Sequence, residues 1–117
     1  MTRAEFDTYC GSLKGVAHVV QWGNASVWKI GGKIFAICPN WGEGDGPMFT
    51  FKCSDLAFNV LCDQPGIKPA KYLARAKWVQ LETPEAMSDA NLKLHFQAAY
   101  EIVAAKLTKA KRAELGI

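Results

Sequence analysis

Long apolar runs and closely spaced cysteine pairs are both missing from this 117-residue sequence. No stretch approaches the ~20 apolar residues that cross a bilayer. The first seven residues also lack the apolar core of a signal peptide. We therefore expect no membrane-spanning segment and a cytoplasmic location, and the small size is typical of a bacterial protein.

The four cysteines are dispersed, at Cys10, Cys38, Cys53 and Cys62. None forms a Cys-x-x-Cys pair, and none has the spacing to histidine that zinc sites use. Each lies in or beside an apolar run, where a thiol acts as a small hydrophobic group. The pattern predicts four reduced thiols and no metal site.

Catalytic motifs are missing too, since the sequence contains neither Gly-x-Ser-x-Gly nor His-Glu-x-x-His. The only two histidines are His18 and His95, and they form a catalytic pair only if the fold brings them together. Residues 42–46 have glycine at every second position, like a phosphate-binding loop, but Glu43 and Asp45 would repel an anion. Two carboxylates also supply too few oxygens for calcium. We expect a binding protein without a cofactor, and no enzyme.

What the sequence does contain is a regular series of helix and strand patterns. Thr2 and Glu5 are spaced as a capping box, so a helix begins there, and Gly15 is expected to end it. His18 is expected in the loop after this helix, and Trp22 is also expected in a loop. Strands at 27–30 and 33–37 flank Gly31-Gly32, which is typical of a two-residue hairpin turn. In that register Ile30 lies opposite Lys33, Lys29 opposite Ile34, and Trp28 opposite Phe35.

The second half of the chain continues this alternation. A third strand at 48–52 leads to a short helix that Ser54 caps. Pro69 limits residues 67–68 to a short edge strand, and a further strand covers 78–82. The last helix begins at Ser88 and ends near residue 105 or 107, before a frayed basic tail. The order α-β(3)-α-β(2)-α predicts one α+β domain over residues 1–117, a two-layer sandwich with an antiparallel sheet.

One sheet face is expected to be open to water, because the helices would all pack on the other. Strand alternation assigns the two faces. The helix-facing side chains are expected to be Trp28, Ile30, Phe35, Ile37, Phe49, Phe51, Val79 and Leu81. The open face would carry Lys29, Ile34, Thr50, Lys52, Trp78 and Gln80.

Basic residues are unevenly distributed although the net charge is only +3. Residues 64–81 hold Lys68, Lys71, Arg75 and Lys77 without an acid, and residues 106–112 hold Lys106, Lys109, Lys111 and Arg112 without an acid. Both clusters suit phosphate contacts. They equally suit a solubilising surface and a helix end that favours cations.

Three stretches in order resemble the MmcQ/YjbR family: residues 27–36 (VWKIGGKIFA), 69–79 (PAKYLARAKWV) and 99–107 (AYEIVAAKL). With the spacing between them, the resemblance covers nearly the whole chain. It implies a two-layer fold related to type III secretion chaperones and DNA binding through a "double-wing" arrangement, and it supplies no catalytic residues. The acidic, glycine-rich stretch 41–46 departs from that pattern.

Two functional hypotheses follow. The first is DNA binding by the open sheet face, with Trp78 stacking on a base and cations meeting phosphates; the cations would be Lys29, Lys52, Lys68, Lys71, Arg75 and Lys77. The second is protein interaction or self-association through apolar groups of the same face, Val27, Ile34, Ala36 and Trp78.

Overall fold

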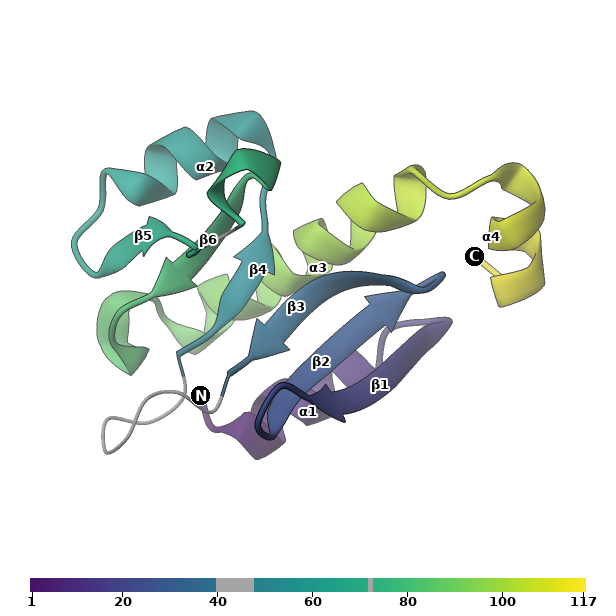
Figure 1. The fold of residues 1–117 in the computed structure, drawn as a ribbon, viewed down its shortest axis with the longest axis horizontal. Helices are drawn as coiled ribbons and strands as arrows, with labels where there is room; N and C mark the ends of the chain where they lie inside the picture. The colour runs from purple at the N-terminus through teal and green to yellow at the C-terminus, as the bar shows by residue number, and fades with distance from the viewer. Residues whose placement is uncertain (40–47, 72) are drawn as a thin grey trace.

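The computed structural model of the chain describes residues 1–39, 48–71 and 73–117. Six strands form one sheet with antiparallel neighbours throughout, in the spatial order β1-β2-β3-β4-β6-β5 (Figure 1). The strands are β1 (Val16–Gln21), β2 (Ala25–Ile30), β3 (Lys33–Cys38), β4 (Thr50–Lys52), β5 (Ile67–Pro69) and β6 (Trp78–Leu81). The helices are α1 (Arg3–Gly11), α2 (Asp55–Cys62), α3 (Asp89–Ala105) and α4 (Lys109–Leu115), with short 3-10 helices η1 (Ala74–Ala76) and η2 (Pro84–Ala86).

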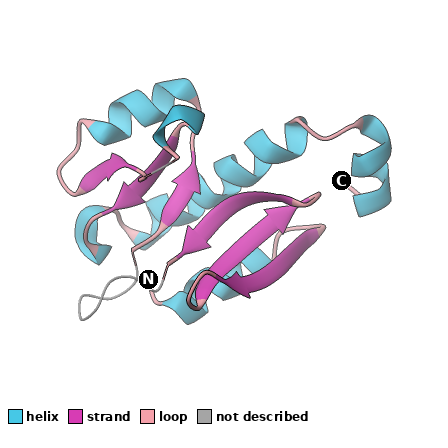
Figure 2. Ribbon diagram, viewed as in Figure 1, coloured by secondary structure: helices cyan, strands magenta, loops and turns pink. Residues whose placement is uncertain are grey.

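The helices cover one face of the sheet, so the predicted α+β class with an antiparallel sheet is confirmed (Figure 2). Helix α3 packs against β3 and β4, α1 against β1 and β2, and α2 against β5 and β6. In Figure 1, α1 and α3 lie behind the sheet. Within the described ranges, no helix combines the length and apolarity needed to cross a membrane.

Side-chain caps start the helices where the sequence predicts. The Thr2 hydroxyl accepts from the Glu5 backbone N–H at 3.1 Å, and the Glu5 carboxylate accepts from the Thr2 N–H at 3.0 Å, which completes the capping box. Ser54 and Ser88 cap α2 and α3 in the same way. Helix α1 ends at Gly11, four residues before the expected end, and Gly15 instead takes a positive φ of 79° in the turn that leads into β1.

The sequence pattern did not predict two of the elements, β1 and α4. Residues 16–21 are not a loop but the edge strand β1, paired with β2. Its side chains are half-buried or exposed, so it lacks the clear apolar alternation of a core strand. The C-terminal residues are not frayed either: Thr108 caps α4, and Leu115 packs against the core. The order is therefore α-β(4)-α-β(2)-α-α.

A β-bulge alters the predicted hairpin register. The pairs Ile30–Lys33 and Lys29–Ile34 are confirmed, but the register then shifts and Trp28 lies opposite Ala36 instead of Phe35. The extra residue reverses the faces beyond it. Ile37 consequently belongs to the open face, while Ala36 and Cys38 join the core on the helix side.

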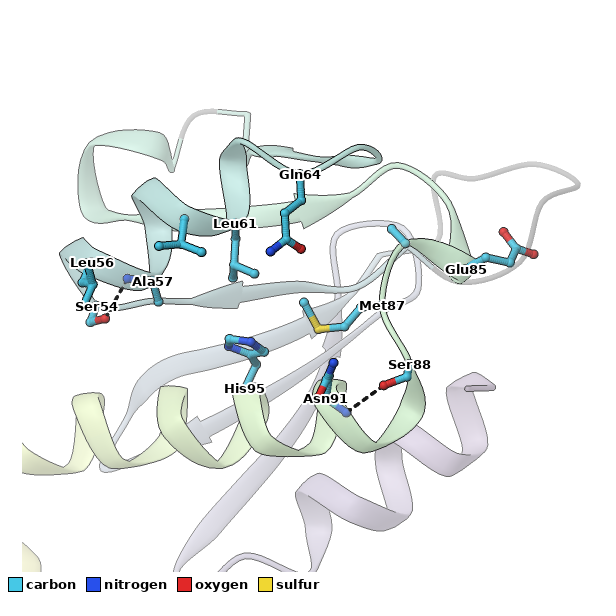
Figure 3. Close-up of a pocket in the computed structure, with 12 residues that line it drawn as sticks. Ser54, Leu56, Ala57, Leu61, Gln64, Glu85, Met87, Ser88, Asn91 and His95 are labelled. Atoms are coloured by element: carbon cyan, nitrogen blue, oxygen red, sulfur yellow. Dashed lines mark hydrogen bonds between the residues drawn. The ribbon is translucent and has the colours of Figure 1, made fainter.

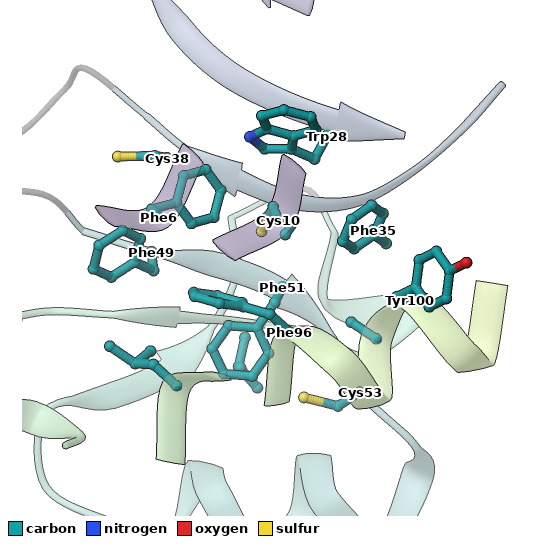
Figure 4. Close-up of a cluster of buried hydrophobic side chains, with 14 of the residues drawn as sticks. Phe6, Cys10, Trp28, Phe35, Cys38, Phe49, Phe51, Cys53, Phe96 and Tyr100 are labelled. Carbon is teal, nitrogen blue, oxygen red and sulfur yellow. The ribbon is translucent and has the colours of Figure 1, made fainter. Parts of the chain in front are cut away.

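The core between sheet and helices is rich in phenylalanine. The Phe96 ring of α3 meets the rings of Phe6, Phe49 and Phe51 edge-on, with centroids 5.1, 5.7 and 5.7 Å away. Figure 4 shows these rings together with Phe35 and Tyr100. This cluster joins α1, α3 and the middle of the sheet, so it positions the opposite face as well.

The two glycines of the β2–β3 turn provide a matched test of packing. Both have positive φ, but a Cβ on Gly31 would lie 2.6 Å from methyl carbons of buried Leu107, whereas a Cβ on Gly32 would meet nothing within 4 Å. We expect Gly32→Ala to cost about 1 kcal/mol from backbone strain, and Gly31→Ala to cost about 1 kcal/mol more from overpacking. Urea unfolding of both variants measures the difference. If the two variants lost the same unfolding free energy, Leu107 would be able to move aside without cost.

Candidate nucleic-acid interface

Trp78 does not lie on an open surface. Its side chain is only 7% exposed and packs on the sheet with Ala25, Val27 and Ile37. The chain after β5 folds back over it: Ala70 and Leu73 join this second cluster, and the Trp78 N–H donates to the Leu73 carbonyl at 3.2 Å. A covered indole has no free face for a base, so the expected exposure of Trp78 is wrong. The sequence predicts no helix or strand between residues 68 and 78, and it could not show that Ala70 and Leu73 cover β6.

The same cover removes most of the predicted apolar docking face. Val27 is fully buried in the second cluster, and Ala36 points to the helix side because of the bulge. Ile34 remains half-buried at the margin of the cluster. The open face is therefore smaller and less apolar than the alternation predicted.

The predicted cations fall in several places. Lys29 lies on β2, opposite Ala17 and Ile34. Lys68 lies on β5, where it is opposite Gln80 and forms a 3.6 Å ion pair with Glu82. Strands β3, β4 and β6 separate these two lysines, so they do not share one contact point. The exposed ion pair is screened by solvent and adds little to stability.

Lys77 leaves the open face altogether. It is the C-cap of η1, directly before β6, and has a left-handed conformation with φ of 64°. Its ammonium nitrogen lies 5.0 Å from the centre of the Phe58 ring on α2. Arg75 and Lys71 are exposed on the segment that covers Trp78.

Three lysines nevertheless converge where β4 ends. Lys52 Nζ donates to the Ala76 carbonyl, which places it beside Lys77. Burial lowers the pKa of Lys52, and the positive charges of Lys106 and Lys77 lower it further, while Asp55 and Cys53 oppose them. Lys106 is the C-cap of α3. The two acid-free segments of the sequence thus meet at Lys52, Lys77 and Lys106, which we call the basic end.

The histidines are not brought together. His18 on β1 stacks on Trp28 at 4.3 Å, and His95 on α3 stacks on Phe51 of β4 at 5.4 Å. Strands β2 and β3 lie between β1 and β4. A catalytic histidine pair is therefore not present in this fold.

His18 belongs to a polar network that the sequence did not indicate, because residues 16–21 gave no clear strand pattern. The Asp7 carboxylate on α1 accepts from the Ser26 hydroxyl at 2.5 Å and from the Trp28 indole N–H at 2.9 Å. Ser26 Oγ also lies 2.8 Å from His18 Nε2. Because the serine proton points to Asp7, His18 donates to Ser26 and cannot accept its proton as a general base. The network joins α1 to β1 and β2.

A groove of about 560 Å³ opens between α2, η2 and the first half of α3. Its lining includes Leu61, Met87 and His95, which lie toward the same space in Figure 3. The outer edge carries Leu56 and Val60, which are 75% and 51% exposed. These two side chains stand one helical turn apart on α2, so the rim of the groove is apolar.

The thiols are free, and burial raises the pKa of each. The pKa of Cys38 is raised to about 11 and that of Cys53 to about 12, so neither is a thiolate near neutral pH. Among the described residues, no three metal-ligating side chains cluster. The glycine-rich stretch 42–46, with Glu43 and Asp45, lies outside the described residues.

Comparison with known proteins identifies the family. A family model described as YjbR matches residues 11–102, which is most of the chain. The chain belongs to the YjbR family. No protein of curated function matches it.

Two solved structures share the YjbR fold with this chain. A Deinococcus radiodurans protein, DR2400, with a DUF419 domain, aligns with a TM-score of 0.86 at 22% identity, covering 99% of this chain and 88% of that one. A Pseudomonas syringae protein aligns with a TM-score of 0.69 at 16% identity, covering 88% and 99%. At these identities the likeness supports the fold of the YjbR chain and no particular activity.

His95 should make the stability of the YjbR chain sensitive to acid. Burial lowers the pKa of His95 below its ordinary value of 6.5, so below that pH the unfolded chain binds a proton that the folded chain resists. The stability contributed by neutral His95 is fully present above about pH 6.5 and is lost as the pH falls below it. His95→Gln should flatten the dependence of unfolding free energy on pH between about 5 and 7. His18→Gln is the control, because it keeps the contribution of His95 to the pH dependence of the unfolding free energy. If wild type and His95→Gln show the same pH dependence of that free energy, the prediction is contradicted.

Proposed function

We propose that this YjbR-family protein binds nucleic acid, DNA in the first place, and that the basic end formed by Lys52, Lys77 and Lys106 contacts the phosphate backbone. The observation that carries the proposal is the convergence of two acid-free segments, far apart in the sequence, on the end of β4. Charge that served only to keep the protein soluble could be dispersed evenly over the surface and would not need to converge at one place.

The electrostatics of the basic end favour an anion. Lys52 is half-buried beside two other cations, and both burial and their charge lower its pKa. A phosphate placed among the three ammonium groups would offset that repulsion and form charge-assisted hydrogen bonds. Arg75, exposed on the neighbouring η1, extends the same positive area. Lys29 and Lys68 lie on other strands and are assigned no central role.

Replacing Lys52, Lys77 and Lys106 together by glutamine is expected to weaken binding to a short labelled DNA duplex. Each phosphate contact that is lost should make the slope of log K against log salt less negative by about 0.9. Fluorescence anisotropy from low to physiological salt measures both the affinity and the slope. The loss should be independent of DNA sequence, because phosphate contacts carry no base information.

Single lysine-to-glutamine variants at Lys52, Lys77 and Lys106 each remove one charge, and Lys93→Gln is their matched control, since Lys93 lies on α3 near the Tyr9 ring and outside the basic end. It removes one charge and should leave the salt slope nearly unchanged. The proposal would be rejected if the wild-type protein did not bind DNA at low salt. It would also be rejected if Lys93→Gln lowered the DNA affinity as much as each single variant of the basic end.

A second candidate is self-association, which the groove beside α2 favours. Exposed aliphatic side chains in a contiguous apolar area often mark an interface, and Leu56 and Val60 border the groove. A second copy of this chain that packs its own α2 there would cover both side chains. This moves the expected contact from the open sheet face to the helix layer.

Light scattering at increasing protein concentration tests this candidate. If α2 mediates a dimer, Leu56→Glu with Val60→Glu should give a monomer, because the charges would have to be buried in the contact. Val20→Glu, at an exposed position on β1, should leave the mass unchanged. A wild-type protein that remains monomeric throughout would exclude it.

A further inference from the structure

A second cavity, of about 190 Å³, lies on the face of the sheet away from α1 and α3. Ile37, Thr50 and Gln80, from β3, β4 and β6, form its floor, with Leu73 on one side. Trp22, from the turn between β1 and β2, stands at its rim. The cavity is thus built by the sheet and by two turns that rise beside it.

Two buried polar side chains, Thr50 and Gln80, line this cavity. Thr50 is 5% exposed and Gln80 is 8% exposed, and they lie opposite each other in the β4–β6 register. Neither side chain has a hydrogen-bond partner among the residues that the structure describes. Among the described residues, every side-chain nitrogen or oxygen that is cut off from solvent has a hydrogen-bond partner. The polar atoms of Thr50 and Gln80 have none, so we infer that they are exposed to the cavity.

Unpartnered buried polar groups are rare because each one costs stability. If Thr50 and Gln80 served only to pack the sheet, apolar residues of similar size could stand in their place without loss of stability. A ligand that hydrogen-bonds to both would account for them. The rest of the lining is mostly apolar, with Lys71 beside it, and suits the flat apolar faces of a ligand whose edge carries the polar groups.

Trp22 adds an aromatic surface to the same cavity. Its backbone has a φ of 51°, and Gly23 and Asn24 that follow are also left-handed. A bulky residue rarely adopts this conformation, yet here it holds an indole that remains 54% exposed at the cavity rim. An exposed aromatic ring of this kind can stack on another planar ring.

We propose that the cavity receives one unstacked base of a single-stranded nucleic acid, an inference that rests on the proposed function and specifies it further. The Gln80 carboxamide offers a donor and an acceptor in one plane, which matches a base edge, and the Thr50 hydroxyl adds a second contact. Trp22 stacks on the ring. The adjoining phosphate meets Lys52, which projects from the same face of β4 two residues beyond Thr50, about 7 Å away.

The test compares two single-stranded oligonucleotides of equal length, one with bases and one with abasic sites throughout, together with a duplex. Fluorescence anisotropy should give about tenfold tighter binding of the strand with bases than of the abasic strand, since stacking and edge contacts are lost in the latter. Gln80→Met and Thr50→Val, each of similar volume, should reduce this ratio toward one. Both should leave the affinity for the abasic strand unchanged, whereas the basic-end variant should weaken all three ligands.

A second measurement on the same two variants, the midpoint of thermal unfolding, separates a loss of binding from a loss of folding. Because each removes an unpaired polar group, Thr50→Val and Gln80→Met should keep or raise the midpoint of thermal unfolding while they lose the preference for bases. Equal binding of the strands with and without bases would overturn the base site and leave the proposed function standing. A base preference that survives when Thr50→Val and Gln80→Met are combined in one protein would also overturn it. No binding of any of the three oligonucleotides would overturn both proposals.

Discussion

The packing of Phe96 against three other phenylalanine rings is the contact on which the rest of this fold depends. The ring lies on α3 and meets Phe6 of α1 together with Phe49 and Phe51 at β4. Each edge-to-face pair adds about 0.5–1.5 kcal/mol beyond the area it buries. Because side chains alternate along β4, fixing Phe49 and Phe51 toward the helices necessarily turns Thr50 and Lys52 to the other face.

That other face is not the bare surface that a simple two-layer sandwich would leave. The segment after β5 covers Trp78, and the bulge at Trp28 and Lys29 turns Ile37 outward to pack beside it. Among the described residues, this face keeps a small cavity with Thr50 and Gln80 on its floor. A broad sheet surface would bind by general charge and stacking, whereas this narrower arrangement suits one ring with a hydrogen-bonding edge.

Charge and polar groups then lie close together along one strand. Lys52 closes β4 at the basic end, and Thr50 stands two residues before it on the same face. Phosphate contacts give affinity without sequence information, and contacts to a base edge give selectivity. The two proposals therefore assign different parts of recognition to neighbouring residues.

The sequence by itself determined the local elements whose causes are local. The capping box at Thr2 and Glu5, the serine caps at Ser54 and Ser88, and the glycine turn at 31–32 each depend on residues within four positions of one another, so their patterns can be read directly. The antiparallel α+β class followed from the order of these elements, and the family resemblance followed from the three stretches at 27–36, 69–79 and 99–107.

Only the tertiary structure decided the rest, because it depends on contacts between distant residues. The bulge places both Phe35 and Ala36 on the helix side, where the Phe35 ring meets Tyr100 of α3 edge-on. Residues 16–21 form β1 because β2 provides its partner. The burial of Trp78 follows from the positions of Ala70 and Leu73, and the meeting of Lys52 with Lys106 follows from the length and direction of α3. Strand alternation predicts which side a residue faces, but not what the chain later places over it.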